Sequence, residues 1–317
     1  MTTETVLFLT QQTLVLAVPL LLAGLGELIV ERSGSVNIGI EGMMLAGALA
    51  GWAAAVACGS AWAGAAAATA VGVMLSALFA LVVIAFRADQ IVAGTAVNLL
   101  AVGLTGLVGA RLQEAGFDRR PPVFFERVGL PLLDRLPGVG PGLFGEGGVF
   151  HQHGLLYVTV LGLVGCHLYL YHTRWGIELR ALGENPAAAE AAGAQVNIRR
   201  TWAVLFGGAC AGLAGAYLSI MYTHRFHDNM TAGRGFLALA LVIFGRWRPL
   251  GLLTAGLVFG AFYAAANQMH VAGWSVTLAR HWVDVAPYLL SLLLLALLAR
   301  RASAPAALGQ PYERPHD

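Results

Sequence analysis

Apolar stretches separated by short polar segments run along most of the chain. A transmembrane helix needs about 20 mainly apolar residues, so most of these stretches are long enough for one crossing. The stretch 235–244 is too short to cross unaided, and 249–279 allows one crossing and a partial return. The pattern predicts an all-α, polytopic membrane protein with about nine transmembrane helices, eight to ten being allowed. The apolar stretches are 5–30, 42–58, 61–86, 90–112, 154–173, 201–222, 235–244, 249–279 and 285–299.

Polar segments divide the chain into a transmembrane domain, 1–302, and a tail, 303–317. Residues 113–150 are rich in proline, glycine and charge, and we expect this loop outside the bilayer. A second polar stretch covers 174–200. Positively charged residues next to spans favour the cytoplasmic side. Eleven of the 19 arginines fall on one side of the predicted topology and eight on the other. This bias predicts that 174–200 and the C-terminus are cytoplasmic, and that 113–150 and the N-terminus are external.

Two of the polar interruptions fall where the backbone is expected at membrane depth. The stretch ERSGSVNIGIEG, 31–42, has three glycines, an asparagine and two glutamates. Non-helical backbone within a bilayer is tolerated where it is buried in protein or faces a water-filled cavity. This break is therefore either part of a solute pathway or an ordinary turn punctuated by Gly34 and Gly39. A loosely similar break, HDNMTAGRGF at 227–236, makes 223–246 a second broken or re-entrant region and raises the hypothesis of an internal repeat.

Composition excludes several functional classes. The chain is 58% hydrophobic and 11% charged, with a mean hydropathy of +0.71, whereas soluble domains carry about 25% charged residues. No lysine is present, so the chain lacks the Walker A lysine that an ATPase needs. No catalytic triad or zinc-hydrolase pattern appears, and we expect neither an enzyme nor a metal site. The cysteines lie in apolar stretches and are expected to be small core residues: Cys58, Cys166 and Cys210.

The polar stretch 174–200 contains the signals of a short helix. Asn185 is suited to the N-cap, Pro186 to the first helical position and Gly193 to the C-terminal cap. The helix would cover about two turns, 186–192, with a surface of alanine and one charge, Glu190. A helix this short is marginal alone in water. We interpret it as a helix that docks into a groove on another protein, the alternative being a plain amphipathic linker.

Polar groups within the spans are few. Asn98 lies in the fourth span, and Glu27 lies near the inner end of the first. An ionisable residue inside a membrane is a functional candidate by default, although Glu27 could simply reach the interface. This scarcity disfavours a proton-coupled carrier without excluding sodium coupling. Three motifs with small residues four apart predict helix-packing faces: Gly47 with Gly51, Gly208 with Gly212, and Gly256 with Gly260.

Three strings occur together along the chain: GELIVERSGSVNIGIEGMMLAGA, ALGENPAAAEAAG and NMTAGRGFLALALVIFGRWRPLG. They resemble the permease subunits of bacterial ABC importers of the branched-chain amino acid and simple-sugar superfamily, and most closely its nucleoside-uptake branch. The resemblance implies an inner-membrane importer with two permeases, two cytosolic ATPases and an extracytoplasmic solute-binding protein. ATP and magnesium would bind the ATPase, and this chain would hold no cofactor.

The resemblance also implies roles for the predicted short helix. Glu190, Ala191, Ala192 and Gly193 match the core of the permease loop whose helix fits into a cleft of the ATPase. With Asn185 and Pro186 they are the candidate ATPase-coupling residues. The sequence departs from the family pattern after this core, at 195–198, so only the core is carried over.

A neutral solute suits a pathway with amide and backbone hydrogen-bonding groups. A nucleoside fits this description, and a simple sugar such as ribose fits it nearly as well. Two alternatives belong to other classes: an ion-coupled carrier or channel acting alone, and a membrane scaffold without transport. The candidate pathway residues are Asn37, Glu41, Asn98 and Asn229, and the candidate contacts to the binding protein are Arg119, Arg120 and Arg225.

Overall fold

The computed structural model describes residues 3–128, 148–271 and 303–313, together with the single positions 285, 289 and 293. Within these ranges, seven helices are long and apolar enough to cross a membrane. The polytopic helical prediction is confirmed. The long helices are α1 (Thr3–Arg32), α2 (Ile40–Cys58), α3 (Ala61–Ala80), α4 (Gln90–Glu114), α7 (Gly154–His172), α10 (Val196–Ala216) and α12 (Pro249–Val271).

Shorter elements extend or connect these helices. A π-helical turn, η1 (Leu81–Ala85), extends α3, and another, η3 (Tyr217–Tyr222), extends α10. The short helices are α8 (Arg174–Glu184), α9 (Pro186–Ala191) and α11 (Arg234–Phe244), with a 3₁₀ turn, η2 (Phe117–Arg119). The strands β1 (Arg127–Val128) and β2 (Gln152–His153) pair antiparallel.

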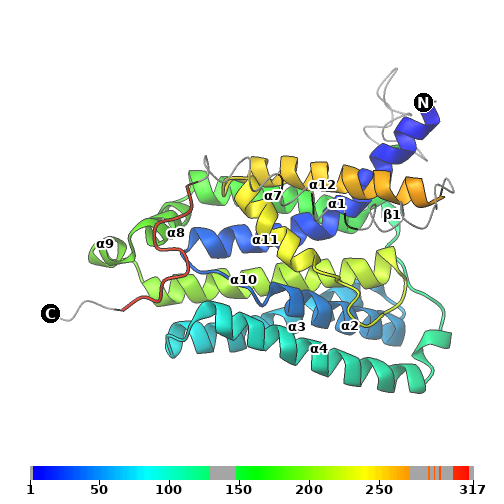
Figure 1. The fold of residues 1–317 in the computed structure, drawn as a ribbon, viewed down its shortest axis with the longest axis horizontal. Helices are drawn as coiled ribbons and strands as arrows, with labels where there is room; N and C mark the ends of the chain where they lie inside the picture. Colours follow the sequence, from blue (N-terminus) through cyan, green and yellow to red (C-terminus); the bar gives the residue numbers. More distant parts are fainter. Residues whose placement is uncertain are drawn as a thin grey trace.

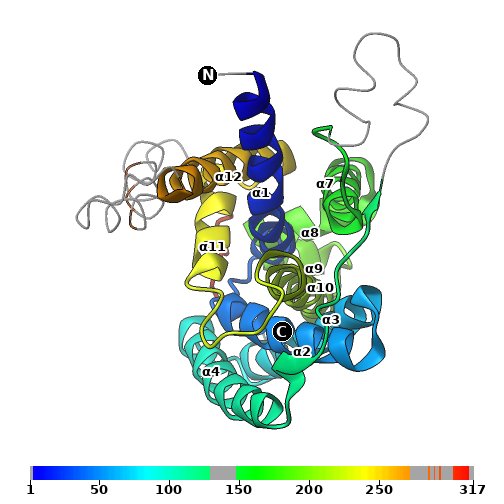
Figure 2. The same ribbon diagram turned by 90° about the vertical axis from the view of Figure 1, so that its right-hand side faces the viewer.

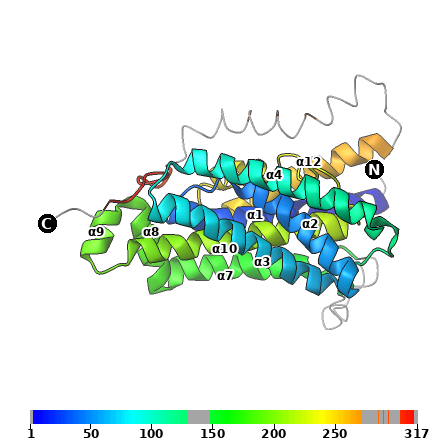
Figure 3. The same ribbon diagram turned by 90° about the horizontal axis from the view of Figure 1, so that it is seen from below.

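The long helices lie roughly side by side along the long axis of the molecule (Figure 1). We call the end that carries α8, α9 and residues 303–313 the α9 end, and the opposite end, with η2, β1 and β2, the loop end. Seen nearly along the bundle, α1 and α10 lie among the other helices (Figure 2). They bury most of their apolar length, whereas α4 buries about a quarter of it. The wide exposed face of α4 lies along one side of the bundle (Figure 3) and is suited to lipid or to another membrane subunit.

Glycines bring α2, α3 and α10 into close contact. A Cβ atom added to Gly215 of α10 would lie 1.9 Å from the Met44 carbonyl oxygen of α2. One added to Gly72 of α3 would lie 2.1 Å from the Gly208 carbonyl oxygen, and one on Gly47 would lie 2.4 Å from that of Gly212. The backbones touch where any larger residue would separate them, as is typical of helix packing in membranes. The predicted packing role is confirmed for the motif residues Gly47, Gly208 and Gly212.

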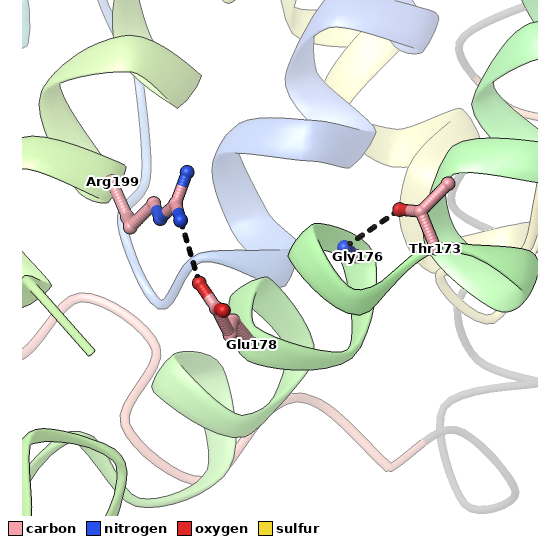
Figure 4. A network of polar contacts seen from close by, with 4 residues as sticks. All are labelled: Thr173, Gly176, Glu178 and Arg199. Carbon is pink, nitrogen blue, oxygen red and sulfur yellow. Dashed lines mark hydrogen bonds and ion pairs between the residues drawn. The ribbon is translucent and has the colours of Figure 1, made fainter. Parts of the chain in front are cut away.

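The sixth span begins earlier than predicted, at Val196 rather than at residue 201. The two arginines that delayed the predicted start are satisfied by protein groups. Arg199 forms an ion pair of 2.7 Å with Glu178 of α8, in a segment whose first turn is capped by Thr173 (Figure 4). Arg200 is buried and donates to the Ser33 carbonyl. Paired in this way, both charges fit inside the first turn and a half of α10.

Other predictions lie partly outside the described residues. The last predicted span, 285–299, lies outside them except for three single positions, and so do half of the external loop, 129–147, and tail residues 314–317. The count of about nine crossings therefore stays a prediction. The apolar stretch at 235–244 forms α11. With 11 residues this helix is too short to cross a membrane unaided, as predicted.

Candidate functional site

Both predicted helix breaks are present, and they lead to the same point. Residues 33–39 are non-helical between α1 and α2, and 223–233 are non-helical between η3 and α11. The carboxylate of Glu41, in the first turn of α2, accepts hydrogen bonds from the N–H groups of Gly233 and Gly235 at 2.7 and 2.6 Å. Glu41 therefore caps the start of α11 from a different helix. We call residues 37–42 and 231–235, with Glu27 and Asn98, the helix-start junction.

The two helices leave this junction in opposite directions. After α2 the chain turns into α3, where Trp62 packs edge-on against Phe125 of the loop end with 5.2 Å between ring centroids. After α11 the carbonyl of Trp247 accepts a 2.8 Å hydrogen bond from Arg32, at the end of α1 beside α8. Thus α2 runs from the junction toward the loop end and α11 toward the α9 end. Both helices therefore place their positive N-terminal ends inside the bundle.

Asn98 of α4 holds the start of α2. Its Oδ1 accepts from the Gly42 N–H at 2.7 Å, and its Nδ2 donates to the Ile38 carbonyl at 2.9 Å. Residue 98 lies eight positions after the start of α4, about 12 Å along the helix axis at the usual rise. The junction is therefore well inside the bundle and not at a helix end. Both hydrogen-bonding groups of the Asn98 amide are committed to the backbone of the break.

Asn37 and Glu27 form the second polar contact of the junction. The Asn37 N–H donates to Glu27 Oε1 at 2.9 Å, and both residues are fully buried. The alternative that Glu27 reaches the membrane interface is therefore wrong, because its side chain turns inward to the break. The Asn37 side chain donates to the Met43 sulfur at 3.3 Å.

Four buried oxygen atoms around the two breaks have no hydrogen-bond partner among the described residues: Glu27 Oε2, Ser35 Oγ, Asn37 Oδ1 and Thr231 Oγ1. A buried polar atom without a partner costs about 1–3 kcal/mol. All four oxygens can accept hydrogen bonds from hydroxyl or amine groups, the two hydroxyls can also donate, and the two helix starts favour groups with partial negative charge. This chemistry is compatible with a neutral, hydroxylated solute.

The fourth predicted pathway residue is placed differently. Asn229 is exposed, in the turn before α11, with a positive φ of 54°. Its carbonyl accepts from the Ala232 N–H at 3.0 Å, and within the described ranges no hydrogen bond joins it to the other three. The structure therefore brings Asn37, Glu41 and Asn98 together and leaves Asn229 at the surface.

The three predicted docking arginines lie at the loop end. Arg119 and Arg120 are in or beside η2, Arg225 follows η3, and all three are exposed. Phe117 and Phe226 both pack against Trp52, with centroid distances of 6.0 and 6.5 Å, so the two arginine-bearing segments share one aromatic cluster. The neighbouring His153 adds little positive charge at neutral pH, because burial lowers the pKa of its imidazole.

The short helix in the second polar stretch is present as α9, one residue shorter than predicted. Asn185 accepts from the Ala188 N–H at 3.0 Å, and Pro186 occupies the first turn. Gly193 has a φ of +94°. Its N–H group donates to the backbone carbonyl of Glu190, and the N–H group of Ala194 donates to the backbone carbonyl of Ala189. This pair of bonds is the usual glycine-dependent helix stop. Ala191, Ala192 and Gly193 are exposed on its outer surface.

Sequence reasoning missed the contacts of three residues near the first helix break: Glu31, Arg200 and Trp247. Trp247 donates its indole N–H to the buried carboxylate of Glu31, and Arg200 joins the loop after α1 to the chain terminus. In the sequence, Glu31 and Arg200 are simply charged residues beside apolar spans, and such residues ordinarily lie at the membrane interface. Their partners lie far along the chain, so pattern alone could not pair them.

Residues 9–298 match the protein family described as the branched-chain amino acid transport system permease component. This match covers most of the chain. The chain belongs to this permease family. Among curated relatives, the permease is 34% identical to the guanosine ABC transporter permease protein NupQ of Bacillus subtilis, over 95% of this chain and 94% of the relative.

Two further relatives have related names. The nucleoside ABC transporter permease protein NupC of Lactococcus lactis is 32% identical over 94% of each chain. The putative glucose ABC transporter permease protein TsgC13 of Haloferax volcanii is 38% identical over 77% of this chain and 72% of the relative. No solved structure matches the permease.

Proposed function

We propose that this permease translocates a nucleoside in an ATP-driven importer. The observation that carries the proposal is similarity over nearly the whole chain to permeases named for guanosine and nucleosides. The junction supports it chemically, because unpartnered acceptors and two helix starts suit a neutral solute with several hydroxyl groups. A simple sugar is the second candidate, favoured by the relative named for glucose.

The proposed assembly has two permease subunits, two cytosolic ATPases and an extracytoplasmic binding protein in a bacterial inner membrane. Hydrolysis of ATP with magnesium belongs to the ATPase. In this arrangement the α9 end faces the cytoplasm, and Arg119, Arg120 and Arg225 meet acidic groups of the binding protein at the loop end. Residues of α9 (Asn185, Pro186, Glu190, Ala191) and the exposed Ala192 and Gly193 enter the ATPase cleft.

Transport by alternating access requires the closed junction to open to each side in turn. Closure of the ATPase pair moves α9, and the movement separates the starts of α2 and α11. Glu41, Asn98 and Asn37 then exchange their backbone partners for hydroxyl and base groups of the solute. No covalent chemistry is required of this chain.

Uptake into lipid vesicles tests the function. The complete complex is reconstituted with ATP inside or outside, and labelled guanosine, adenosine, ribose and glucose are supplied with the binding protein. We expect saturable nucleoside uptake that requires ATP and all partners. Sugar uptake in place of nucleoside uptake would support the second candidate. Uptake by the permease alone, driven by an ion gradient, would refute both.

A substitution at the end of α9 tests its role as a docking helix. Gly193→Val forces a branched side chain into a backbone with φ of +94°, which costs roughly 1–2 kcal/mol per residue. We expect the helix stop to rearrange and the ATPase to be lost from the purified complex, while the permease itself remains folded. Retention of the ATPase at the wild-type ratio would contradict the docking role.

Gly116→Val is the matched control. Gly116 has a φ of +77° and, like Gly193, has no atom within 4 Å of an added Cβ, but it lies at the loop end. The local backbone strain is therefore similar, and we expect the ATPase to be retained.

A further inference from the structure

The C-terminal segment 303–313 is ordered against the α9 end, although neither the pathway nor the docking helix requires it. It runs past α8 and the loop that follows α1 to α9 (red in Figure 1). Pro305 and Ala307 are buried in this contact. We call residues 303–313 the strap.

One set of contacts joins the strap to α8 and α9. The Ala307 N–H donates to the Gly183 carbonyl of α8 at 2.8 Å. The Tyr312 hydroxyl donates to the carboxylate of Glu190 in α9. The Tyr312 ring also packs against a small apolar cluster that contains Ala189, the one buried residue of α9. The strap therefore contacts the charged residue of α9 and the apolar cluster that includes its buried residue.

A second set of contacts joins the strap to the break after α1. The Gly309 N–H donates to the Gly34 carbonyl at 3.0 Å. Arg200, which is 2% exposed, donates from Nε to the Ser33 carbonyl at 3.1 Å and from Nη1 to the Gln310 carbonyl at 2.9 Å. The guanidinium thus holds the break and the strap together in a site shielded from water, where hydrogen bonds to a charged donor are strong.

These segments meet without spare volume. Gly34 has a φ of +88°, and an added Cβ would lie 2.7 Å from Arg200 Nη2 and 3.3 Å from the Ala307 carbonyl oxygen. An added Cβ on Gly183 would lie 2.5 Å from the Arg32 carbonyl oxygen. Close-packed contacts of this kind transmit displacement, because packed interiors compress little.

The break continues directly into the helix-start junction. The Val36 N–H donates to the Gln90 side chain at 2.7 Å, and the next residue, Asn37, is held by Glu27. Three residues later α2 begins. The strap therefore lies one short, hydrogen-bonded segment away from the junction.

Contacts at the strap's outer end are of a different kind. Arg87 and Glu313 are 3.7 Å apart, and more than half of each side chain is exposed. A solvent-exposed pair of this kind contributes little. The connection between α9 and the break therefore rests on Tyr312, on the backbone bonds and on Arg200.

We propose that the strap is a second coupling element, with Tyr312 as its positioning residue: it holds α9 in orientation and carries the displacement of α9 to the break at 33–37. This role rests on the proposed function as an ATP-driven permease. A six-residue helix with one buried alanine has few contacts of its own to the bundle. Without the strap, its motion would reach the junction through the hinge at Asn185 and α8, or through residues 192–195 into α10, and neither route contacts the break at 33–37 through α9 itself.

The first experiment measures hydrogen exchange of the purified permease, without partners. Tyr312→Phe removes one hydroxyl and keeps the ring, and deletion of 303–317 removes the whole strap. We expect faster exchange at 188–194 in both variants, and at 33–38 in the deletion. Gln310→Ala is the control, because the Gln310 side chain is exposed and its carbonyl, which Arg200 binds, is retained. Unchanged exchange in both variants would overturn the proposal.

The second experiment measures coupling in the reconstituted complex. For Tyr312→Phe we expect ATP hydrolysis and ATPase binding to persist while solute uptake per ATP falls about 5-fold or more, the range of a typical coupling free energy. Gln310→Ala should match wild type. Altered exchange with normal uptake per ATP would overturn the coupling role. If the wild-type complex shows no ATP-driven uptake, the proposed function fails, and the coupling role fails with it.

Discussion

Glu41→Ala is expected to abolish uptake and to destabilise the permease by about 3 kcal/mol or more, since each hydrogen bond to a charged group contributes about 1.5–3 kcal/mol. The variant leaves the half-buried N–H group of Gly233 and the buried N–H group of Gly235 without their acceptor. It also leaves the positive ends of α2 and α11 facing each other without a neutralising charge. Thermal unfolding of the purified permease and vesicle uptake measure the two effects.

Two further variants make this test specific. Glu41→Gln keeps one acceptor oxygen but places an amide donor against the second N–H group, so we expect partial recovery of stability and little recovery of uptake. Glu114→Ala is the control, because Glu114 is largely exposed and forms only a surface pair with Arg111. Its effect should stay within about 0.5 kcal/mol. Wild-type uptake by Glu41→Ala would show that the α11 start does not need this cap.

Gly215→Ala is expected to prevent normal folding, because its methyl group would overlap the backbone of α2. The added Cβ would lie 1.9 Å from the Met44 carbonyl oxygen and 2.7 Å from the Ala48 nitrogen, both backbone atoms of α2. No side chain can rotate away, so α2 and α10 must separate along their contact. Overpacking typically costs about 1–3 kcal/mol, and we expect at least the upper value here. The yield of monodisperse protein and its unfolding temperature are the measurements.

The same change elsewhere in the chain provides the control. Gly103 lies in α4 with no atom within 4 Å of an added Cβ. Gly103→Ala should leave folding intact or stabilise the helix, by up to about 1 kcal/mol from intrinsic propensity. Equal behaviour of the two alanine variants would refute the close packing of α2 against α10.

Much of the site could be predicted because its signals are local. Asn185, Pro186 and Gly193 determine the bounds of α9 to within one residue, since capping depends on a few adjacent backbone groups. The helix breaks at 33–39 and 223–233 could also be predicted, because glycine and polar residues interrupt apolar runs there. Asn229 lies at the surface, and its role in the pathway stays a prediction.

What the sequence determined by itself is the membrane environment, the interruptions and the short helix α9, because each follows from hydropathy or from contacts within one or two turns. Only the tertiary structure decided that Glu41 caps α11, that Glu27 turns inward, that Arg200 joins residues 303–313 to the break after α1, and that Tyr312 joins them to α9. These partners are separated by 10 to 194 positions. Such pairings depend on how whole helices pack, and a side chain's own sequence neighbourhood carries no record of the partner it meets.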